Sequence, residues 1–211
     1  MESSASAPVA SHIEPEPRDW QPRALWVSGR MLCGVVSFFF MAFLFAYFYL
    51  RALDQNHAWK IGAVNPSLGL GTGIAALLLL SAVVFRLGTS RTADTLATGV
   101  VALVLGLIAV VLQFVEFTTL GFGPASGAYA SVFIGWTSTY AIVALFGLYW
   151  VETQMASLWR ARNDEGIHRP LREGVPADDI VLLRAGIEAC SFYWAFFVGI
   201  GVLAYIVLYL V

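Results

Sequence analysis

The segment SFFFMAFLFAYFYLRALD, residues 37–54, joins a dense aromatic run to an abruptly charged end. Every residue from Phe38 to Leu50 is apolar or aromatic, and Arg51 and Asp54 follow. Aromatic rings and a snorkelling basic side chain gather where a transmembrane helix leaves the bilayer core. We therefore interpret Tyr47, Tyr49 and Arg51 as anchors at a membrane interface, at the outer end of the first membrane-spanning helix.

The composition of the whole chain supports a membrane location. Of its 211 residues, 59% are hydrophobic and 12% are charged, whereas about a quarter of the residues of a soluble domain are charged. This chain has too little polar surface to cover a water-soluble globule. The net charge of −2 gives no indication of a nucleic-acid partner.

Five apolar runs are long enough to cross a bilayer core of about 30 Å as helices. We place the spans at residues 27–50, 67–87, 95–120, 128–158 and 185–210. The fourth is too long for a straight crossing and must tilt or project from the membrane. The short alternating segments of a barrel are absent. The sequence therefore predicts an all-α membrane protein in which residues 25–211 form a bundle of five transmembrane helices.

Residues 1–24 differ from the rest in being rich in proline, serine and acids. Such a segment cannot bury enough apolar surface to fold alone, so we expect an extended arm that could dock on a partner. It has no apolar core of the kind found in signal peptides.

Basic residues orient the bundle, because they concentrate in cytoplasmic segments. With five spans, ten of the twelve lysines and arginines fall on the side of the N-terminal arm, and Arg51 and Lys60 fall on the other. We predict a cytoplasmic N-terminus and a C-terminus outside.

Small residues stand at helix-packing spacing in two spans, as Gly69 with Gly73 and Ala102 with Gly106. Such pairs let helices approach closely, either within the bundle or at a dimer face. Cys33 and Cys190 lie in apolar runs, where we expect small core residues rather than a disulfide.

Residues suited to metal or covalent chemistry are scarce inside the spans. His12, His57 and His168 all lie outside them, so the bundle offers no axial ligands for haem or copper. No zinc spacing, nucleotide loop or nucleophile elbow is present. We expect the chain to be catalytically silent, with no catalytic, cofactor-binding or metal-binding residue of its own.

The polar residues within the spans are the candidate functional positions. Glu116 follows Gln113 by three residues, so both lie on one helical face, and Glu188 follows Arg184 by four. A carboxylate in lipid faces a partner or water. Glu116 could tie two helices together, carry a proton or ion, or meet another subunit. Glu188 could pair with Arg184 near a helix N-terminus, or contact a headgroup or partner.

Five segments follow one another in an order known from one membrane-protein family. They are SFFFMAFLFAYFYLR (37–51), Asn65-Pro66, QFVEF (113–117) after Gly106, GAYASVFIGWT (127–137) and GIEACSFYWAFF (186–197). The last three are similar to Gly…Gln-x-x-Glu-Tyr, Gly-x-Tyr-x-Ser-x-Phe-Phe-x-x-Thr and Gly-Phe-Glu-Ala-x-x-x-Tyr-Trp-His-Phe-Val-Asp. Over residues 28–211 the chain resembles subunit III of the haem-copper oxidases, the cytochrome c oxidase family. Its form resembles the bacterial one with five helices, which lacks the first two of seven.

The chain departs from the family pattern at its intramembrane polar positions. The family's glutamate after Ser37 is replaced by an uncharged residue, and so are two pairs of polar residues in later spans. The residues at these positions are Phe38, Tyr140, Val143, Ala195 and Val198. Apolar replacement of a buried charged network can be neutral for stability, so the scaffold can survive while a proton-related role is lost.

The resemblance implies a non-catalytic subunit of a respiratory terminal oxidase in the bacterial plasma membrane. Its partners would be the catalytic subunit I, which carries haem and copper, the other oxidase subunits, membrane lipids and a larger respiratory supercomplex. The chain would stabilise that neighbour and hold phospholipid between its helices. The intramembrane positions named for this role are Gln113, Glu116, Glu188, Tyr193 and Trp194. Two alternatives remain: an accessory subunit of a nitric oxide reductase, and a small membrane transporter, which the scarcity of midplane polar residues disfavours.

Overall fold

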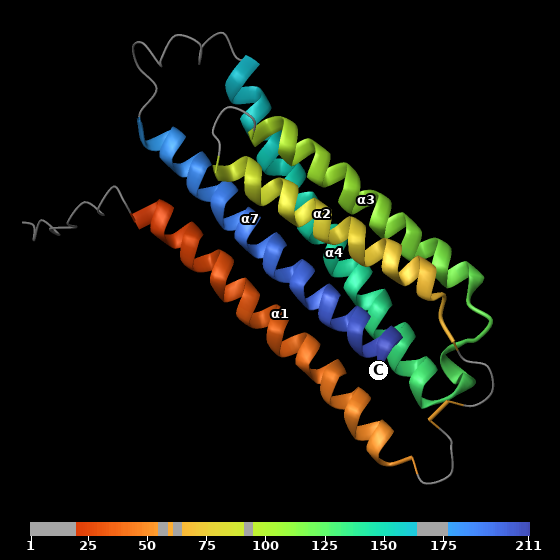
Figure 1. Cartoon of the computed structure of the whole chain (residues 1–211). Helices are drawn as coiled ribbons and strands as arrows, with labels where there is room; N and C mark the ends of the chain where they lie inside the picture. Colours follow the sequence, from red (N-terminus) through yellow and green to blue (C-terminus); the bar gives the residue numbers. More distant parts are fainter. Residues whose placement is uncertain (1–19, 55–58, 61–64, 91–94, 164–176) are drawn as a thin grey trace, which may run out of the picture.

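The computed structural model describes residues 20–54, 59–60, 65–90, 95–163 and 177–211, and the regular elements in these ranges are all helical (Figure 1). The five long helices are α1 (Trp20–Ala52), α2 (Leu68–Ser90), α3 (Thr95–Thr119), α4 (Ala128–Asn163) and α7 (Ala177–Tyr205). A short 3-10 helix, η1 (Pro124–Ser126), precedes α4, and a π-helix, η2 (Ile206–Leu210), continues α7. In the part of the chain that the structure describes, five helices are long and apolar enough to cross a membrane, which confirms the predicted all-α fold with five such helices.

The first helix begins earlier than the sequence suggested. Residues 20–24, which we expected in the extended arm, belong to α1, and this boundary was wrong. The physical reason lies in Pro22, which stands in the first turn, where a backbone N–H has no acceptor within the helix. Residues 1–19 of the arm lie outside the described part of the chain.

The fourth and fifth helices extend beyond the length needed to cross a bilayer. Helix α4 runs without interruption for 36 residues, which corresponds to about 54 Å against a hydrocarbon core of about 30 Å. Helix α7 begins at Ala177, well before the predicted start at residue 185. Both extensions lie at the end of the bundle where α1 begins (Figure 1).

Helix α7 occupies a central position in the bundle. It packs against α1, α2 and α4, while α2 and α3 form the most extensive helix pair. Figure 1 shows α7 between α1 and α2, and in the described part these two helices make little contact with each other. One face of α7 is therefore left open between α1 and α2.

Of the two predicted pairs of small residues, one packs inside the bundle and the other does not. Ala102 and Gly106 are both buried, and a Cβ atom on Gly106 would stand 2.5 Å from Leu148 Cδ2, so this pair packs inside the bundle as expected. A Cβ atom on Gly69 or Gly73 would meet nothing within 4 Å. These two glycines therefore do not serve packing within the chain.

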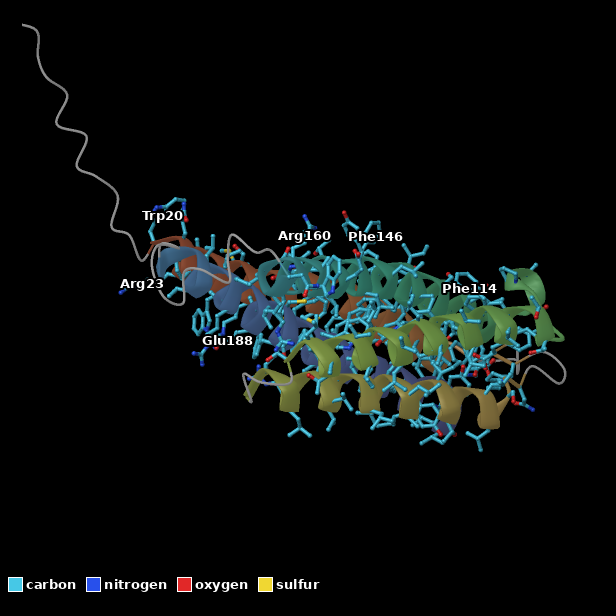
Figure 2. The ribbon with its side chains drawn as sticks, turned by 90° about the horizontal axis from the view of Figure 1, so that it is seen from above. Trp20, Arg23, Phe114, Phe146, Arg160 and Glu188 are labelled. Atoms are coloured by element: carbon cyan, nitrogen blue, oxygen red, sulfur yellow. The ribbon has the colours of Figure 1, made fainter. Side chains whose placement is uncertain are left out.

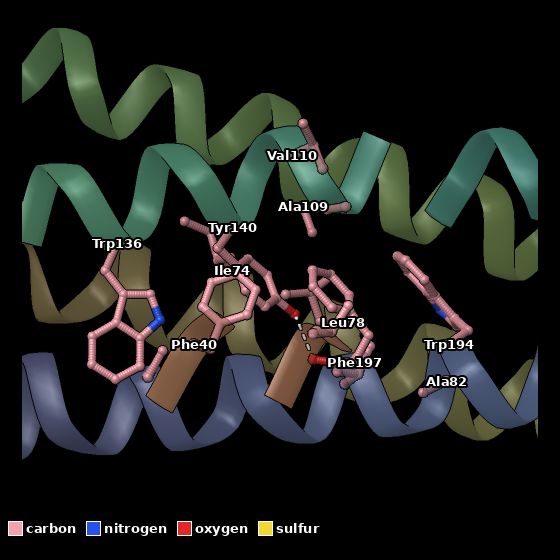
Figure 3. Close-up of a cluster of buried hydrophobic side chains, with 14 of the residues drawn as sticks. Phe40, Ile74, Leu78, Ala82, Ala109, Val110, Trp136, Tyr140, Trp194 and Phe197 are labelled. Atoms are coloured by element: carbon pink, nitrogen blue, oxygen red, sulfur yellow. Dashed lines mark hydrogen bonds between the residues drawn. The ribbon is translucent and has the colours of Figure 1, made fainter. Parts of the chain in front are cut away.

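Aromatic side chains fill the centre of the bundle (Figure 3). Phe197 of α7 stacks on Tyr140 of α4 with ring centroids 4.4 Å apart, and Phe40 of α1 meets both rings edge-on. The Tyr140 hydroxyl donates a hydrogen bond of 3.2 Å to the Phe197 carbonyl oxygen. Cys33 and Cys190 are buried as free thiols, as predicted.

The outer surface of the bundle is also apolar. Large side chains such as Phe38, Phe114 and Phe146 are exposed, and Figure 2 shows Phe146 projecting away from the ribbon. Exposed apolar side chains cost free energy in water, but they cost none when the surrounding medium is the hydrocarbon core of a bilayer. The surface therefore fits a multi-pass membrane protein.

Candidate functional site

The structure brings Gln113 and Glu116 together with Tyr209 in a buried polar cluster, called here the Glu116 cluster. Gln113 Nε2 donates a hydrogen bond of 2.9 Å to Glu116 Oε2, and the Tyr209 hydroxyl donates one of 2.7 Å to the same oxygen. The side chain of Glu116 is fully buried. Its second oxygen, Oε1, has no hydrogen-bond partner among the described residues.

The local sequence explains why these side chains meet. Gln113 and Glu116 are three residues apart on α3 and so share one face. Tyr209 comes from the far end of the chain, in the π-helix η2, where the Val211 amide donates to the Ile206 carbonyl oxygen at 3.2 Å. This wider turn is rare and recurs at functional sites.

Tyr209 is held in place by two neighbouring helices as well. Its ring lies against Gly71 of α2, where a Cβ atom would stand 2.3 Å from Tyr209 Cε1. Its ring centroid is 5.4 Å from that of Phe133 of α4. The Glu116 cluster therefore connects α2, α3, α4 and η2, which supports the interpretation of Glu116 as an interhelical tie.

Trp194 forms a second buried polar connection. Its indole Nε1 donates a hydrogen bond of 3.0 Å to Ser81 Oγ, and Ser81 Oγ donates one of 2.7 Å to the Ala102 carbonyl oxygen. Trp194 belongs to α7, Ser81 to α2 and Ala102 to α3. Tyr193 is also buried, with its ring stacked on Phe197. Both residues thus act in the packing of α7.

Glu188 has the predicted partner but not the predicted place in its helix. Arg184 Nε lies 3.1 Å from Glu188 Oε1, with the two side chains 68% and 46% exposed. Because α7 begins at Ala177, Glu188 stands beyond the first turn, to which the effect of the helix dipole is confined. The expected N-terminal dipole contribution was therefore wrong. An ion pair this exposed contributes about 0–1 kcal/mol.

The three expected interface anchors at the end of α1 differ from one another. Tyr49 is exposed and stacks on Phe45. Tyr47 is buried against Trp59, with ring centroids 5.1 Å apart, so within this chain it belongs to the core. Arg51 Nη1 donates to the Tyr47 hydroxyl at 3.3 Å and to the Val211 carbonyl oxygen at 3.1 Å, which links the end of α1 to the end of η2.

The five positions that depart from the family pattern have mixed surroundings. Phe38 is 85% exposed on α1. Tyr140 and Val198 are buried, and Val143 and Ala195 are half-buried. A polar residue at Phe38 would face the surroundings of this chain and not its interior. These five positions are therefore not gathered in one internal network of this chain.

Metal chemistry was not expected in this chain. Across the described ranges there is no group of three or more His, Cys, Asp or Glu side chains that could hold a metal ion. His12, His57 and His168 lie outside those ranges. The absence of a metal site in the chain therefore stays a prediction.

Sequence reasoning missed Tyr209, Ser81 and Gly71. Ser81 interrupts the apolar run LLLLSAVVF, residues 77–85, and this interruption was a usable signal. Tyr209 and Gly71 gave none, because their roles depend on which helices become neighbours.

Comparison with known proteins adds no family to these observations. No protein-family model matches the chain, and no curated protein is detectably similar in sequence.

Proposed function

We propose that this chain is a non-catalytic, subunit-III-like integral subunit of a bacterial respiratory terminal oxidase. In such a complex, electrons from cytochrome c reduce oxygen to water and protons are translocated. The chain's part would be to pack on the subunit that carries haem and copper, to stabilise it, and to bind phospholipid. We further propose that it lies in the plasma membrane with its N-terminus cytoplasmic and its C-terminus outside.

The observation that carries the proposal is how the family-like segments pack together. Phe43 of the segment 37–51 stacks on Trp136 of the segment 127–137, with ring centroids 6.0 Å apart. Phe133 of that second segment meets Tyr209, which donates to Glu116 of the segment 113–117. Three segments far apart in sequence are thus linked inside the bundle, two directly and the third through Tyr209.

A fourth family-like segment joins the same core. Phe197, in the segment 186–197, meets Phe40 of the first segment with ring centroids 6.1 Å apart. The four segments thus pack against one another in one bundle. This arrangement supports the proposal, because the segments that resemble the family share one core.

The chemistry of the described bundle suits a supporting role. The one fully buried carboxyl group, among the residues that the structure describes, is that of Glu116, and it is held by Gln113 and Tyr209. The remaining interior is mainly aromatic and aliphatic. Within the described ranges, such an interior holds a single buried carboxyl group and supplies a rigid surface for a neighbouring helix bundle.

The test is purification of the native chain from its own membrane in mild detergent. The measurements are a reduced-minus-oxidised spectrum and the rate of oxygen uptake with reduced cytochrome c. An unrelated multi-span protein, carrying the same tag and purified from the same membrane, is the control. Haem absorption with cytochrome-c-dependent oxygen uptake, absent from the control, is the expected result.

Three outcomes would contradict the proposal in different ways. An intact preparation without haem would remove the oxidase role. A haem-containing preparation that reduces nitric oxide but takes up no oxygen would assign the chain to a nitric oxide reductase. Solute flux by the chain alone in vesicles would instead support a transporter.

A further inference from the structure

Three arginines from three different helices line one open pocket, called here the arginine pocket. Arg30 comes from α1, Arg86 from α2 and Arg184 from α7, and the pocket has a volume of about 510 Å³. Glu188 is the one acidic residue in its lining. The volume lies in the range of pockets that bind small ligands, about 300–1,000 Å³.

The contacts that these three arginines make do not neutralise all of their positive charge. Arg184 is paired with Glu188 at 3.1 Å. The Arg30 guanidinium carbon lies 3.0 Å from the centroid of the Trp26 ring, and this stacking leaves the N–H groups at the guanidinium edge free to donate. Arg86 is exposed, and among the described residues its carbonyl oxygen accepts from Thr89 Oγ1 while its guanidinium group has no hydrogen-bond or ion-pair partner. The pocket therefore carries a net positive charge that an anion can balance.

The place of the pocket in the bundle fits the headgroup level of a bilayer. It is at the end of the bundle where α1 and α7 begin and α2 ends. The exposed rings of Trp20, Trp26 and Trp159 gather at this same end, as tryptophans do at a membrane–water interface. At this depth the abundant anion is a lipid phosphate, and arginine binds phosphate with paired, charge-assisted hydrogen bonds.

An apolar stripe leads from the pocket toward the middle of the membrane. Phe192 lines the pocket, and Phe196, Gly199 and Leu203 follow at intervals of four, three and four residues on the exposed face of α7. This is the face left open between α1 and α2. A Cβ atom at Gly199 would meet nothing within 4 Å. The stripe thus offers an uninterrupted apolar surface on which an acyl chain can lie.

We propose that the arginine pocket binds the headgroup of an anionic phospholipid, with the phosphate on Arg30, Arg86 and Arg184 and an acyl chain along the stripe on α7. A zwitterionic headgroup binds less well, because its ammonium group would meet three guanidinium groups and one carboxylate that is already paired. This inference specifies the lipid-binding part of the proposed function. It needs the membrane location but not the oxidase role.

The test uses the full chain, alone, in nanodiscs of phosphatidylcholine that contain a small fraction of fluorescent phosphatidylglycerol. Energy transfer from the chain's tryptophans to the labelled lipid measures how much lipid is held at the protein. Arg86→Gln removes one unpartnered guanidinium without touching the core. Arg160→Gln is the matched control, because Arg160 is an exposed arginine in the last turn of α4, near the same end of the bundle.

We expect Arg86→Gln to weaken phosphatidylglycerol binding about fivefold, the effect of one basic side chain near an anionic membrane surface. Arg160→Gln should leave binding unchanged. Gly199→Leu fills the stripe in a region of open space without adding a tryptophan donor, and it should also reduce lipid binding while the chain stays folded. Labelled phosphatidylcholine should bind less tightly than phosphatidylglycerol to the unmodified chain.

Three results would overturn the proposal. One is equal binding of phosphatidylcholine and phosphatidylglycerol. Another is an effect of Arg160→Gln as large as that of Arg86→Gln, which would indicate a diffuse surface charge. The third is complete release of the lipid by inorganic phosphate, which would assign the pocket to a free anion. The oxidase assay can fail without affecting any of these measurements, since the chain is tested without partners.

Discussion

The hydroxyl of Tyr209 donates a hydrogen bond of 2.7 Å to Oε2 of Glu116, across 93 residues of sequence. This contact fastens the last turn of the chain's described part to the last two turns of α3. Glu116 is fully buried, and a carboxyl group in such surroundings is tolerated when donors reach it. The stability of the bundle therefore depends on a residue that no sequence motif marks.

Replacing Tyr209 by phenylalanine should show how much this hydrogen bond contributes to the stability of the bundle. The ring would keep its packing on Gly71 and Phe133, but Glu116 would lose one of its two donors. We expect a loss of about 1–3 kcal/mol in the free energy of unfolding, the usual effect of leaving a buried acceptor without its partner. The measurement is reversible denaturation of the purified chain in detergent.

Tyr205→Phe is the matched control for that substitution. The Tyr205 hydroxyl pairs with Thr72 Oγ1 at 2.7 Å, but at an exposed site, so its loss should be small. If both variants lost the same free energy of unfolding, the burial of Glu116 would not be the reason why its hydrogen bond to Tyr209 stabilises the bundle.

Substitutions of Glu116 separate a structural tie from a role that requires a titratable group. Glu116→Gln keeps an oxygen that accepts from Gln113 and Tyr209, whereas Glu116→Leu leaves both donors buried without an acceptor. We expect the leucine variant to be less stable by about 1–3 kcal/mol and the glutamine variant to stay close to the native chain. Both are measured by thermal unfolding in detergent.

If the chain is isolated in the proposed oxidase complex, the glutamine variant has a second readout there. If Glu116 acts as a tie, the rate of oxygen uptake and the number of protons translocated should be unchanged by Glu116→Gln. A glutamine variant that is stable but translocates fewer protons would contradict the structural interpretation and favour a proton-carrying role.

The sequence predicted the parts of this structure that depend on local pattern. Long apolar runs predicted all five helices, and the three-residue spacing of Gln113 and Glu116 placed them on one face. It failed where the outcome depends on which helices become neighbours. Tyr47 and Tyr49 look alike in sequence, but one packs on Trp59 and the other is exposed. No local pattern separates them.

Glycines on α2 illustrate the same limit and lead to a further prediction. Gly71 and Gly73 lie one helical half-turn apart, and spacing alone pointed to Gly73. The structure places Gly71 against the Tyr209 ring, with three ring atoms within 2.7 Å of a Cβ atom, while Gly73 faces open space. Gly71→Ala should therefore destabilise the bundle by about 1–3 kcal/mol through overpacking.

Gly73→Ala is the control in the same helix. It should leave stability unchanged or raise it by up to about 1 kcal/mol, the difference in helix propensity between the two residues. Denaturation of the two variants side by side distinguishes close packing from propensity. If both alanine variants were stabilised, the tight contact between α2 and Tyr209 would be wrong.

The orientation in the membrane can be tested with single cysteines at the two ends of the bundle. Cys33 and Cys190 are buried, so they should react slowly with a membrane-impermeant maleimide and give a low background. Ser157 near the end of α4 and Thr118 near the end of α3 are both exposed. Because α3 and α4 are consecutive spans, these positions lie at opposite ends of the bundle.

In intact cells we expect Thr118→Cys to be labelled and Ser157→Cys to be protected until the membrane is opened. This result would place the arginine pocket on the cytoplasmic side. The reverse pattern would contradict the cytoplasmic N-terminus and put the pocket on the outer leaflet, while leaving its chemistry as described.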